Sequence, residues 1–156
     1  MGMEIAKRSN LRLYLLDINS GVLAEAENNF KEQGMAERST VIKAPVEELP
    51  FIDDYFDLIV SRGSIFFWQD ITSGLQEIYR VLKPGRVAFV GGGASRLMTE
   101  TEIKEFFDWA RPLHRKHCKD WDKIRSEKYL RERLAQAGIG NYKIHTGYGT
   151  WIEMKK

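Results

Sequence analysis

The sequence predicts an α/β fold in which a mostly parallel, doubly wound sheet is followed by a C-terminal antiparallel hairpin. Short strand-like runs alternate with longer runs of helical periodicity from residue 11 to residue 138, which is typical of parallel sheets covered by helices. The run 57–60 (DLIV) is apolar at its centre, as expected of a strand covered on both faces. Two further strand-like runs flank the glycines of 147–149, which predicts the terminal hairpin.

Length and composition favour a single soluble domain over residues 1–156. The formal net charge of +2 is too small to indicate a nucleic acid or an acidic membrane as a partner. The longest apolar run, 87–90, is far shorter than the about 20 residues that a membrane-spanning helix needs. The single cysteine, Cys118, leaves no internal disulfide and fits a reducing compartment. We therefore expect a cytoplasmic protein.

Strands and helices are predicted in turn along the first ninety residues. The predicted strands are short apolar or β-branched runs, at 11–16, 40–42, 57–60 and 86–90. A helix is predicted over 21–33, where apolar side chains recur at helical spacing and Gly34 provides a stop. A second, strongly amphipathic helix begins at Ile71 and is expected to stop at 83–85 (KPG). The glycine run 91–93 follows the last of these strands and is expected to let the chain turn.

The last third of the chain combines helices with the hairpin. Residues 99–123 form a charged helical stretch that carries aromatic residues. We expect it to break near Pro112 and to act as a helical insertion or lid. Another helix follows and ends at Gly138. The hairpin strands are predicted at 142–145 and 150–154.

Asp17 comes directly after the first predicted strand. In parallel sheets ligands bind beyond the carboxyl ends of the strands, and a carboxylate there can accept two hydrogen bonds from a ribose diol. The alternative is a structural role in which Asp17 caps the next helix or forms an Asx-turn before it, although Asn19 and Ser20 are equally available for this role. The residue alone leaves both interpretations open.

Three motifs follow Asp17 in the first hundred residues. They are EELPF at 47–51, FDLIVS at 56–61 and RVLKPG at 80–85. Together with Asp17, and in this order, they resemble the class I methyltransferases that use S-adenosylmethionine, with Arg86 in place of the family's last glycine. The resemblance covers residues 1–95 closely. It implies a Rossmann-like sheet, S-adenosylmethionine as the cofactor, and methyl transfer as the activity.

The resemblance assigns cofactor contacts to particular residues. Asp17 matches the acidic residue that binds the ribose hydroxyls, and Ile18 matches the neighbour that packs on adenine. Val46 matches a position whose backbone amide meets an adenine nitrogen, and Glu47, the next residue, is grouped with it as cofactor-binding. Pro45 stands where the family usually has an aspartate for the adenine amino group, so this polar contact is expected to be missing.

The same resemblance places Ser61 and Arg62 beside the methionine part of the cofactor. Phe66, Phe67 and Trp68 would line the route to the methyl acceptor and bind the substrate. Their alternative role is packing in the core beneath a loop. Because the small net charge does not favour a nucleic acid, the expected acceptor is a small molecule.

The family's first strand and its G-x-G-x-G turn precede a helix that resembles residues 2–8, so we expect the printed sequence to lack both. Those glycines let backbone amides approach the cofactor closely. One alternative is therefore a catalytically inactive methyltransferase-like module that acts through self-association, as a homodimer, or through a protein partner. A reading frame called at an internal methionine would explain the same feature.

No residue is singled out as catalytic, because methyl transfer depends mainly on holding the acceptor in line with the methyl group and excluding water. Asp54, Tyr55, His145 and Tyr148 are all compatible with a catalytic role, and the sequence favours none of them.

A metal site is not predicted. His114, His117 and Cys118 lie at helical spacing, which could place three ligands on one face. The surrounding lysines and arginines would repel a cation, and no fourth ligand lies nearby in the sequence.

Overall fold

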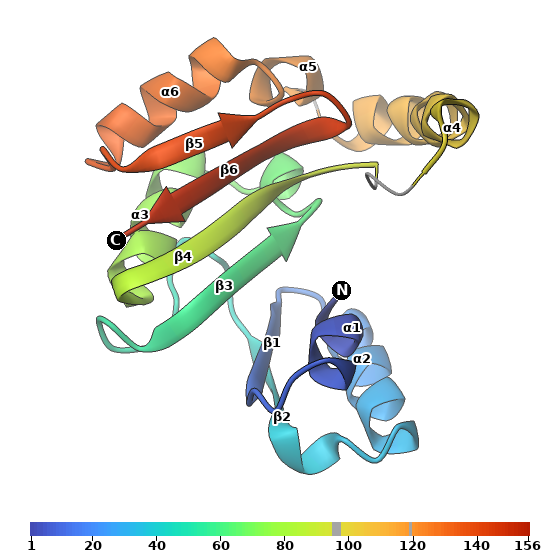
Figure 1. Cartoon of the computed structure of the whole chain (residues 1–156), viewed down its shortest axis with the longest axis vertical. Coiled ribbons are helices and arrows are strands. Elements are labelled where there is room, and N and C mark those ends of the chain that lie inside the picture. The colour runs from blue at the N-terminus through green and yellow to red at the C-terminus, as the bar shows by residue number, and fades with distance from the viewer. Residues whose placement is uncertain (95–97, 119) are drawn as a thin grey trace. The chain divides into compact units, whose positions relative to one another are not determined.

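Helices and strands alternate along the chain in a computed structural model that describes residues 1–94, 98–118 and 120–156, without the side chains of 113–115 and 117 (Figure 1). Two compact units make up the chain, residues 1–50 and residues 51–156. The single domain expected over 1–156, with an insertion at 99–123, stays a prediction.

The first unit contains a two-stranded parallel sheet and two α-helices. Its elements are α1 (Gly2–Lys7), β1 (Leu13–Asp17), α2 (Ser20–Glu32), the 3-10 helix η1 (Ala36–Arg38) and β2 (Ser39–Lys43). β1 pairs with β2 in parallel, so that Leu13 lies opposite Ser39 and Asp17 lies opposite Lys43. The carboxyl ends of both strands therefore lie at the same edge of this sheet.

Capping and packing hold α2 in place. The Asn19 side chain accepts hydrogen bonds from two amides in the first turn of α2, which satisfies donors that have no partner inside the helix. Phe30 is buried on its inner face. Arg38 donates hydrogen bonds to the backbone oxygens of Ala6 and Ser9, at 3.0 and 2.7 Å. This arginine ties η1 to the end of α1 and to the segment that follows it.

The second unit contains a four-stranded mixed sheet. Its elements are β3 (Phe56–Arg62), the 3-10 helix η2 (Ile65–Phe67), α3 (Ile71–Val81), β4 (Leu82–Gly93), α4 (Glu100–His117), α5 (Trp121–Ile124), α6 (Glu127–Gln136), β5 (Tyr142–His145) and β6 (Gly149–Lys155). The strand order is β3-β4-β6-β5. β3 and β4 are parallel, whereas β6 is antiparallel to both β4 and β5. The predicted parallel pairing and terminal hairpin are confirmed.

The core of the second unit lies between α3, α6 and the sheet. Asp70 caps α3 by accepting a hydrogen bond from the Thr72 amide at 2.8 Å. The side chains that are almost wholly buried include Leu75 and Ile78 of α3, Leu130 and Leu134 of α6, and Val90, Ile152 and Met154 of the sheet. α3 packs on β4 and on α6. The apolar face predicted for this helix is therefore the face that it buries.

β4 begins earlier than the sequence predicted. The helix ends at Val81, and the strand already pairs at Leu82, opposite Phe56. The register then shifts before Val87 pairs with Leu58. Residues 83–85 lie within this irregularity rather than in a turn between helix and strand.

The sequence predicted that the glycine run 91–93 turns the chain, and this prediction is wrong. The run continues β4 and pairs with β6, with Gly91 opposite Trp151 and Gly93 opposite Gly149. The two backbones approach so closely that a Cβ atom at Gly91 would lie 2.2 Å from the Thr150 backbone oxygen. Glycine is needed here because any side chain would collide with the partner strand.

The break predicted near Pro112 is also wrong. α4 runs from Glu100 to His117 with Pro112 inside it. Proline removes one hydrogen-bond donor from a helix interior, but the helical backbone continues on both sides. The predicted helix end at Gly138 is confirmed, because this glycine has a φ of 73° just after the C-cap of α6.

Candidate functional site

The carboxyl end of β1 holds Asp17 in a defined orientation. Its Oδ1 accepts a hydrogen bond from the Asn19 amide at 2.8 Å, which is the Asx-turn of the structural alternative. The cap of α2 is Asn19 and not Asp17. The Asp17 backbone oxygen accepts a hydrogen bond from the Ala44 amide at 3.3 Å, which joins the ends of β1 and β2. Ile18, the next residue, is 64% exposed. A half-buried carboxylate is thus followed by an exposed apolar side chain.

Val46 and Glu47 lie in a turn just after β2. The Glu48 amide donates a hydrogen bond to the Pro45 backbone oxygen at 3.3 Å, which closes this turn. Val46 and Glu47 are both half-buried. Their assignment to the cofactor stays a prediction.

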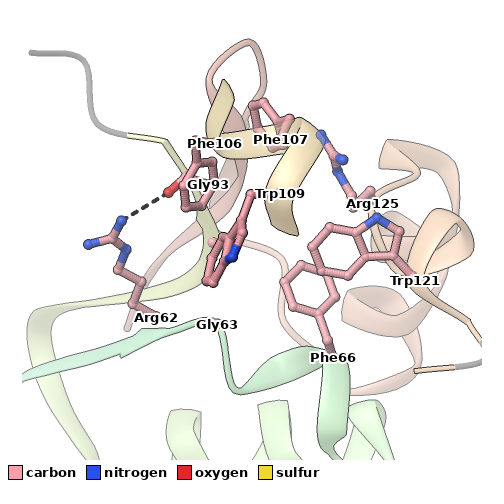
Figure 2. A pocket seen from close by; sticks show the side chains of 10 residues that line it. Arg62, Gly63, Phe66, Gly93, Phe106, Phe107, Trp109, Trp121 and Arg125 are labelled. Atoms are coloured by element: carbon pink, nitrogen blue, oxygen red, sulfur yellow. Dashed lines mark hydrogen bonds between the residues drawn. The ribbon is translucent and has the colours of Figure 1, made fainter. Parts of the chain in front are cut away.

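Ser61 and Arg62 end β3 in the second unit. The Ser61 hydroxyl forms a hydrogen bond with the Ser64 hydroxyl. The Arg62 guanidinium donates a hydrogen bond to the Gly93 backbone oxygen at 3.1 Å (Figure 2). The Gly63 amide donates to the Gly91 backbone oxygen at 2.6 Å. The bonds to Gly93 and Gly91 hold the carboxyl ends of β3 and β4 side by side.

A cavity of about 220 Å³ lies beside these two strand ends (Figure 2). It is lined by Arg62, Gly63, Phe66, Gly92, Gly93, Phe106, Phe107, Trp109, Trp121 and Arg125. At the three glycines the wall consists of backbone atoms alone. A Cβ atom at Gly92 would lie 3.2 Å from the Phe66 ring. Five aromatic rings and two guanidinium groups supply the rest of the lining.

Of the three aromatic residues predicted to bind substrate, the structure brings Phe66 to the cavity. Phe66 is buried, and its ring centroid lies 4.2 Å from that of Trp121. Phe67 is 51% exposed, and Trp68 donates a hydrogen bond from Nε1 to the Ser64 hydroxyl at 3.1 Å. Neither Phe67 nor Trp68 lines the cavity.

Most of the aromatic wall was not assigned from the sequence. Phe106, Phe107 and Trp109 come from α4, and Trp121 comes from α5. The available signal was the cluster of three aromatic residues within four positions of a highly charged helix. No sequence pattern indicated a role for Arg125, because its position beside the cavity depends on the tertiary packing of α4 and α5.

Arg125 lies among aromatic rings. Its guanidinium carbon is 5.0 Å from the Phe107 ring centroid and 5.4 Å from that of Trp121, distances at which a cation is attracted to the ring face. Burial lowers the pKa of Arg125, and the positive charge of Arg111 lowers it further, while Asp122 acts in the opposite direction. The guanidinium still carries its charge at neutral pH, because its ordinary pKa is far higher.

The four residues considered for a catalytic role lie elsewhere. Asp54 forms an ion pair with the side chain of the last residue, at 2.7 Å. Tyr55 stacks on the ring of Phe51. The His145 ring forms a hydrogen bond with the Glu153 carboxylate, and the Tyr148 backbone oxygen accepts one from the Ala94 amide. None of the four lines the cavity.

Part of the RVLKPG motif has a structural role. Arg80 donates hydrogen bonds to the Phe51 backbone oxygen and to the Asp53 carboxylate, each at 2.8 Å, and to the Glu77 carboxylate at 2.7 Å. The bonds to Glu77 and Asp53 raise the pKa of Arg80 above its ordinary value. The arginine thus fastens the segment before β3 to α3.

Within the described part of the chain, no group of three or more histidine, cysteine or acidic side chains could hold a metal ion. The side chains of His114 and His117 lie outside the described residues. Cys118 is buried. Helices long and apolar enough to cross a membrane are likewise absent from the described residues.

Residues 2–90 match the protein family described as a methyltransferase domain. A structure from Methanococcus maripaludis, assigned as an S-adenosyl-L-methionine-dependent methyltransferase, is 30% identical with a TM-score of 0.82. That match covers 99% of this chain and 71% of the other. The chain belongs to the S-adenosylmethionine-dependent methyltransferase family. The predicted α/β, Rossmann-like fold is confirmed by the same match.

Curated relatives of this methyltransferase domain include two named methyltransferases. The ubiquinone/menaquinone biosynthesis C-methyltransferase UbiE of Stenotrophomonas maltophilia is 31% identical over 65% of this chain and 36% of its own length. A chloroplastic 2-methyl-6-phytyl-1,4-hydroquinone methyltransferase of Oryza sativa is 39% identical over 53% of this chain and 24% of its own length. The chain thus spans only about a third or less of these relatives.

S-adenosylmethionine is the cofactor of the family. The end of β1 is compatible with the adenosine part of this molecule. Asp17 presents a carboxylate of which one oxygen accepts a backbone amide, and a carboxylate can accept further hydrogen bonds from hydroxyl groups. The exposed Ile18 side chain provides an apolar surface suited to a flat base.

Proposed function

We propose that this methyltransferase domain binds S-adenosylmethionine and transfers its methyl group to a small-molecule acceptor. Membership of the family supports the reaction type. The observation that carries the proposal for this chain is the carboxylate of Asp17 at the end of β1, followed by exposed Ile18. Both residues occupy the edge of a parallel sheet where ligands bind in such folds.

Asp17 has the main role in holding the cofactor. Its carboxylate would accept hydrogen bonds from the ribose hydroxyls, and the bond from the Asn19 amide fixes its orientation. When bound, S-adenosylmethionine would supply an activated methyl group on a sulfonium. The cavity beside the ends of β3, β4 and α4 receives the acceptor, and its aromatic wall orients the acceptor. Holding the acceptor in line with the methyl group provides most of the catalysis.

Calorimetric titration of the full chain with S-adenosylhomocysteine tests the proposal. We expect saturable binding by the natural sequence. Asp17→Asn should weaken it about ten- to a hundredfold, because losing a hydrogen bond to a charged group costs about 1.5–3 kcal/mol. Glu25→Gln is the matched control, since Glu25 is an exposed carboxylate on α2, and it should bind like the parent.

A folded chain that releases no heat at millimolar S-adenosylhomocysteine would contradict the proposal. Equal affinity of the parent and Asp17→Asn would contradict the role given to Asp17. Circular dichroism of each variant shows whether the fold is retained. The homodimer and the cytoplasmic location expected from the sequence stay predictions.

A further inference from the structure

The cavity of the second unit combines a positive charge with aromatic walls. Arg62 and Arg125 both line it, and no acidic residue does. Arg111 lies close enough to Arg125 for its charge to lower the pKa of Arg125. The electrostatic potential in the cavity therefore favours an anionic ligand.

Arg125 is the better placed of the two lining arginines. Arg62 is exposed and already donates to the Gly93 backbone oxygen. Arg125 is half-buried against the rings of Phe107 and Trp121 (Figure 2).

Arg125 forms no ion pair with any carboxylate among the side chains that the structure describes. Asp122 acts on its guanidinium only over a longer distance. The residues whose side chains are not described, 95–97, 113–115, 117 and 119, include no acidic residue. A half-buried guanidinium is stabilised most by a planar carboxylate, which it can bind with two parallel hydrogen bonds.

The size and lining of the cavity suit a flat ring. An apolar cavity of about 150 Å³ is large enough to hold benzene, and this one has a volume of about 220 Å³. Phe66, Phe106, Trp109 and Trp121 bring their rings to it (Figure 2), and aromatic rings stack favourably on one another. One ring or two fused rings would fill the space.

From these observations we infer that the methyl acceptor is a planar aromatic compound of one or two rings that carries a carboxylate. The ring lies among the aromatic side chains, and the carboxylate binds Arg125. This inference rests on the proposed function, and it names the acceptor class that the proposal leaves open.

Two probes of the same shape test the inference. 2-Naphthoate has the ring and the carboxylate, and naphthalene-2-carboxamide replaces the charge with a neutral amide. In calorimetric titrations of the full chain, 2-naphthoate should bind at least tenfold more tightly. Arg125→Gln should abolish this preference and leave the affinity for the carboxamide nearly unchanged. Lys128→Gln, which removes an exposed cation from α6, should preserve the preference.

Equal binding of the two probes by the natural chain would overturn the inference. So would an Arg125→Gln variant that weakens both probes alike, because packing rather than charge would then explain the loss. If Arg125→Gln does not fold, Arg125→Lys replaces it, and the preference should fall while a part of it remains.

Parallel titrations with S-adenosylhomocysteine separate this inference from the proposed function. Saturating S-adenosylhomocysteine should leave 2-naphthoate binding intact. Displacement of the probe would assign Arg125 to the cofactor's own carboxylate and overturn the inference. A chain that binds S-adenosylhomocysteine but does not prefer the carboxylate probe keeps the proposed function and loses the inference. A chain that prefers 2-naphthoate but does not bind S-adenosylhomocysteine would support the carboxylate site and contradict the proposed function.

Discussion

On the terminal hairpin, the Glu153 carboxylate contacts two basic side chains. Its Oε2 lies 2.9 Å from Nε2 of His145, and its Oε1 lies 3.4 Å from Nζ of Lys155. The Glu153 side chain is only 16% exposed. The hydrogen bond from His145, followed by the effect of Lys155, lowers the pKa of Glu153 below its ordinary value of 4.5.

A lowered carboxylate pKa makes stability depend on pH in one direction. The stabilisation is complete above the ordinary pKa of 4.5 and is lost as pH falls through the lower pKa of the folded state. Glu153→Gln should therefore reduce the free energy of unfolding at pH 7 by about 0.5–1 kcal/mol. The difference in unfolding free energy between Glu153→Gln and the parent should become smaller below the ordinary pKa of the carboxylate. Urea denaturation at neutral and strongly acidic pH measures it.

The control for this experiment is Glu132→Gln, which changes an exposed carboxylate on α6. It should alter the unfolding free energy little at either pH. A Glu153→Gln effect that is equally large at both pH values would show that the carboxylate charge is not the cause.

At the scale of elements, α4 is the helix that the sequence described least well. Its 18 residues include Pro112, which cannot donate a hydrogen bond to the backbone oxygen four residues earlier. Local sequence therefore predicted a break. The helix nevertheless continues to His117, and it carries three of the five aromatic residues of the cavity wall.

Pro112→Ala should stabilise the protein, because it restores a donor inside the helix and removes the clash of the proline ring. We expect the free energy of unfolding to rise by up to about 3 kcal/mol, the difference between proline and alanine in a helix interior. Guanidinium denaturation followed by circular dichroism measures the change. Glu105→Ala, at an exposed position of α4, is the control for alanine itself. A Pro112→Ala variant no more stable than the parent would show that α4 is adapted to the proline.

Elements whose determinants lie within the segment itself could be predicted from the sequence. The burial pattern of α3 and the end of α6 at Gly138 are set by local periodicity and local backbone geometry. The glycine run 91–93 could not be interpreted in this way, because its partner strand lies almost sixty residues later in the chain. Only the close approach of β6 explains why glycines extend β4 here.

The residues of the candidate site likewise differ in whether local sequence or tertiary packing determines their position. Asp17 could be found because a carboxylate ends a short apolar strand. Phe66 could be found from the family's pattern after the FDLIVS strand. Trp121 and Arg125 could not, because tertiary packing brings α5 and its flank to the carboxyl end of β3. Sequence patterns identify strand ends better than the helices that cover them.

At the scale of the whole chain, the proposed function assigns one role to each compact unit. Asp17 and Ile18 belong to residues 1–50, and the aromatic cavity belongs to residues 51–156. The first unit carries the carboxylate to which we assign the cofactor, and the second carries the space to which we assign the acceptor. The central claim concerns the first of these, since methyl transfer requires the cofactor.

Nuclear magnetic resonance of the isotope-labelled full chain, titrated with S-adenosylhomocysteine, tests that claim most directly. The account predicts that the backbone amide signals of Asp17 and Ile18 shift and reach saturation. The signal of Gly140, an exposed residue of the second unit, should stay in place. A folded chain whose Asp17 and Ile18 signals do not move at millimolar ligand would contradict the account.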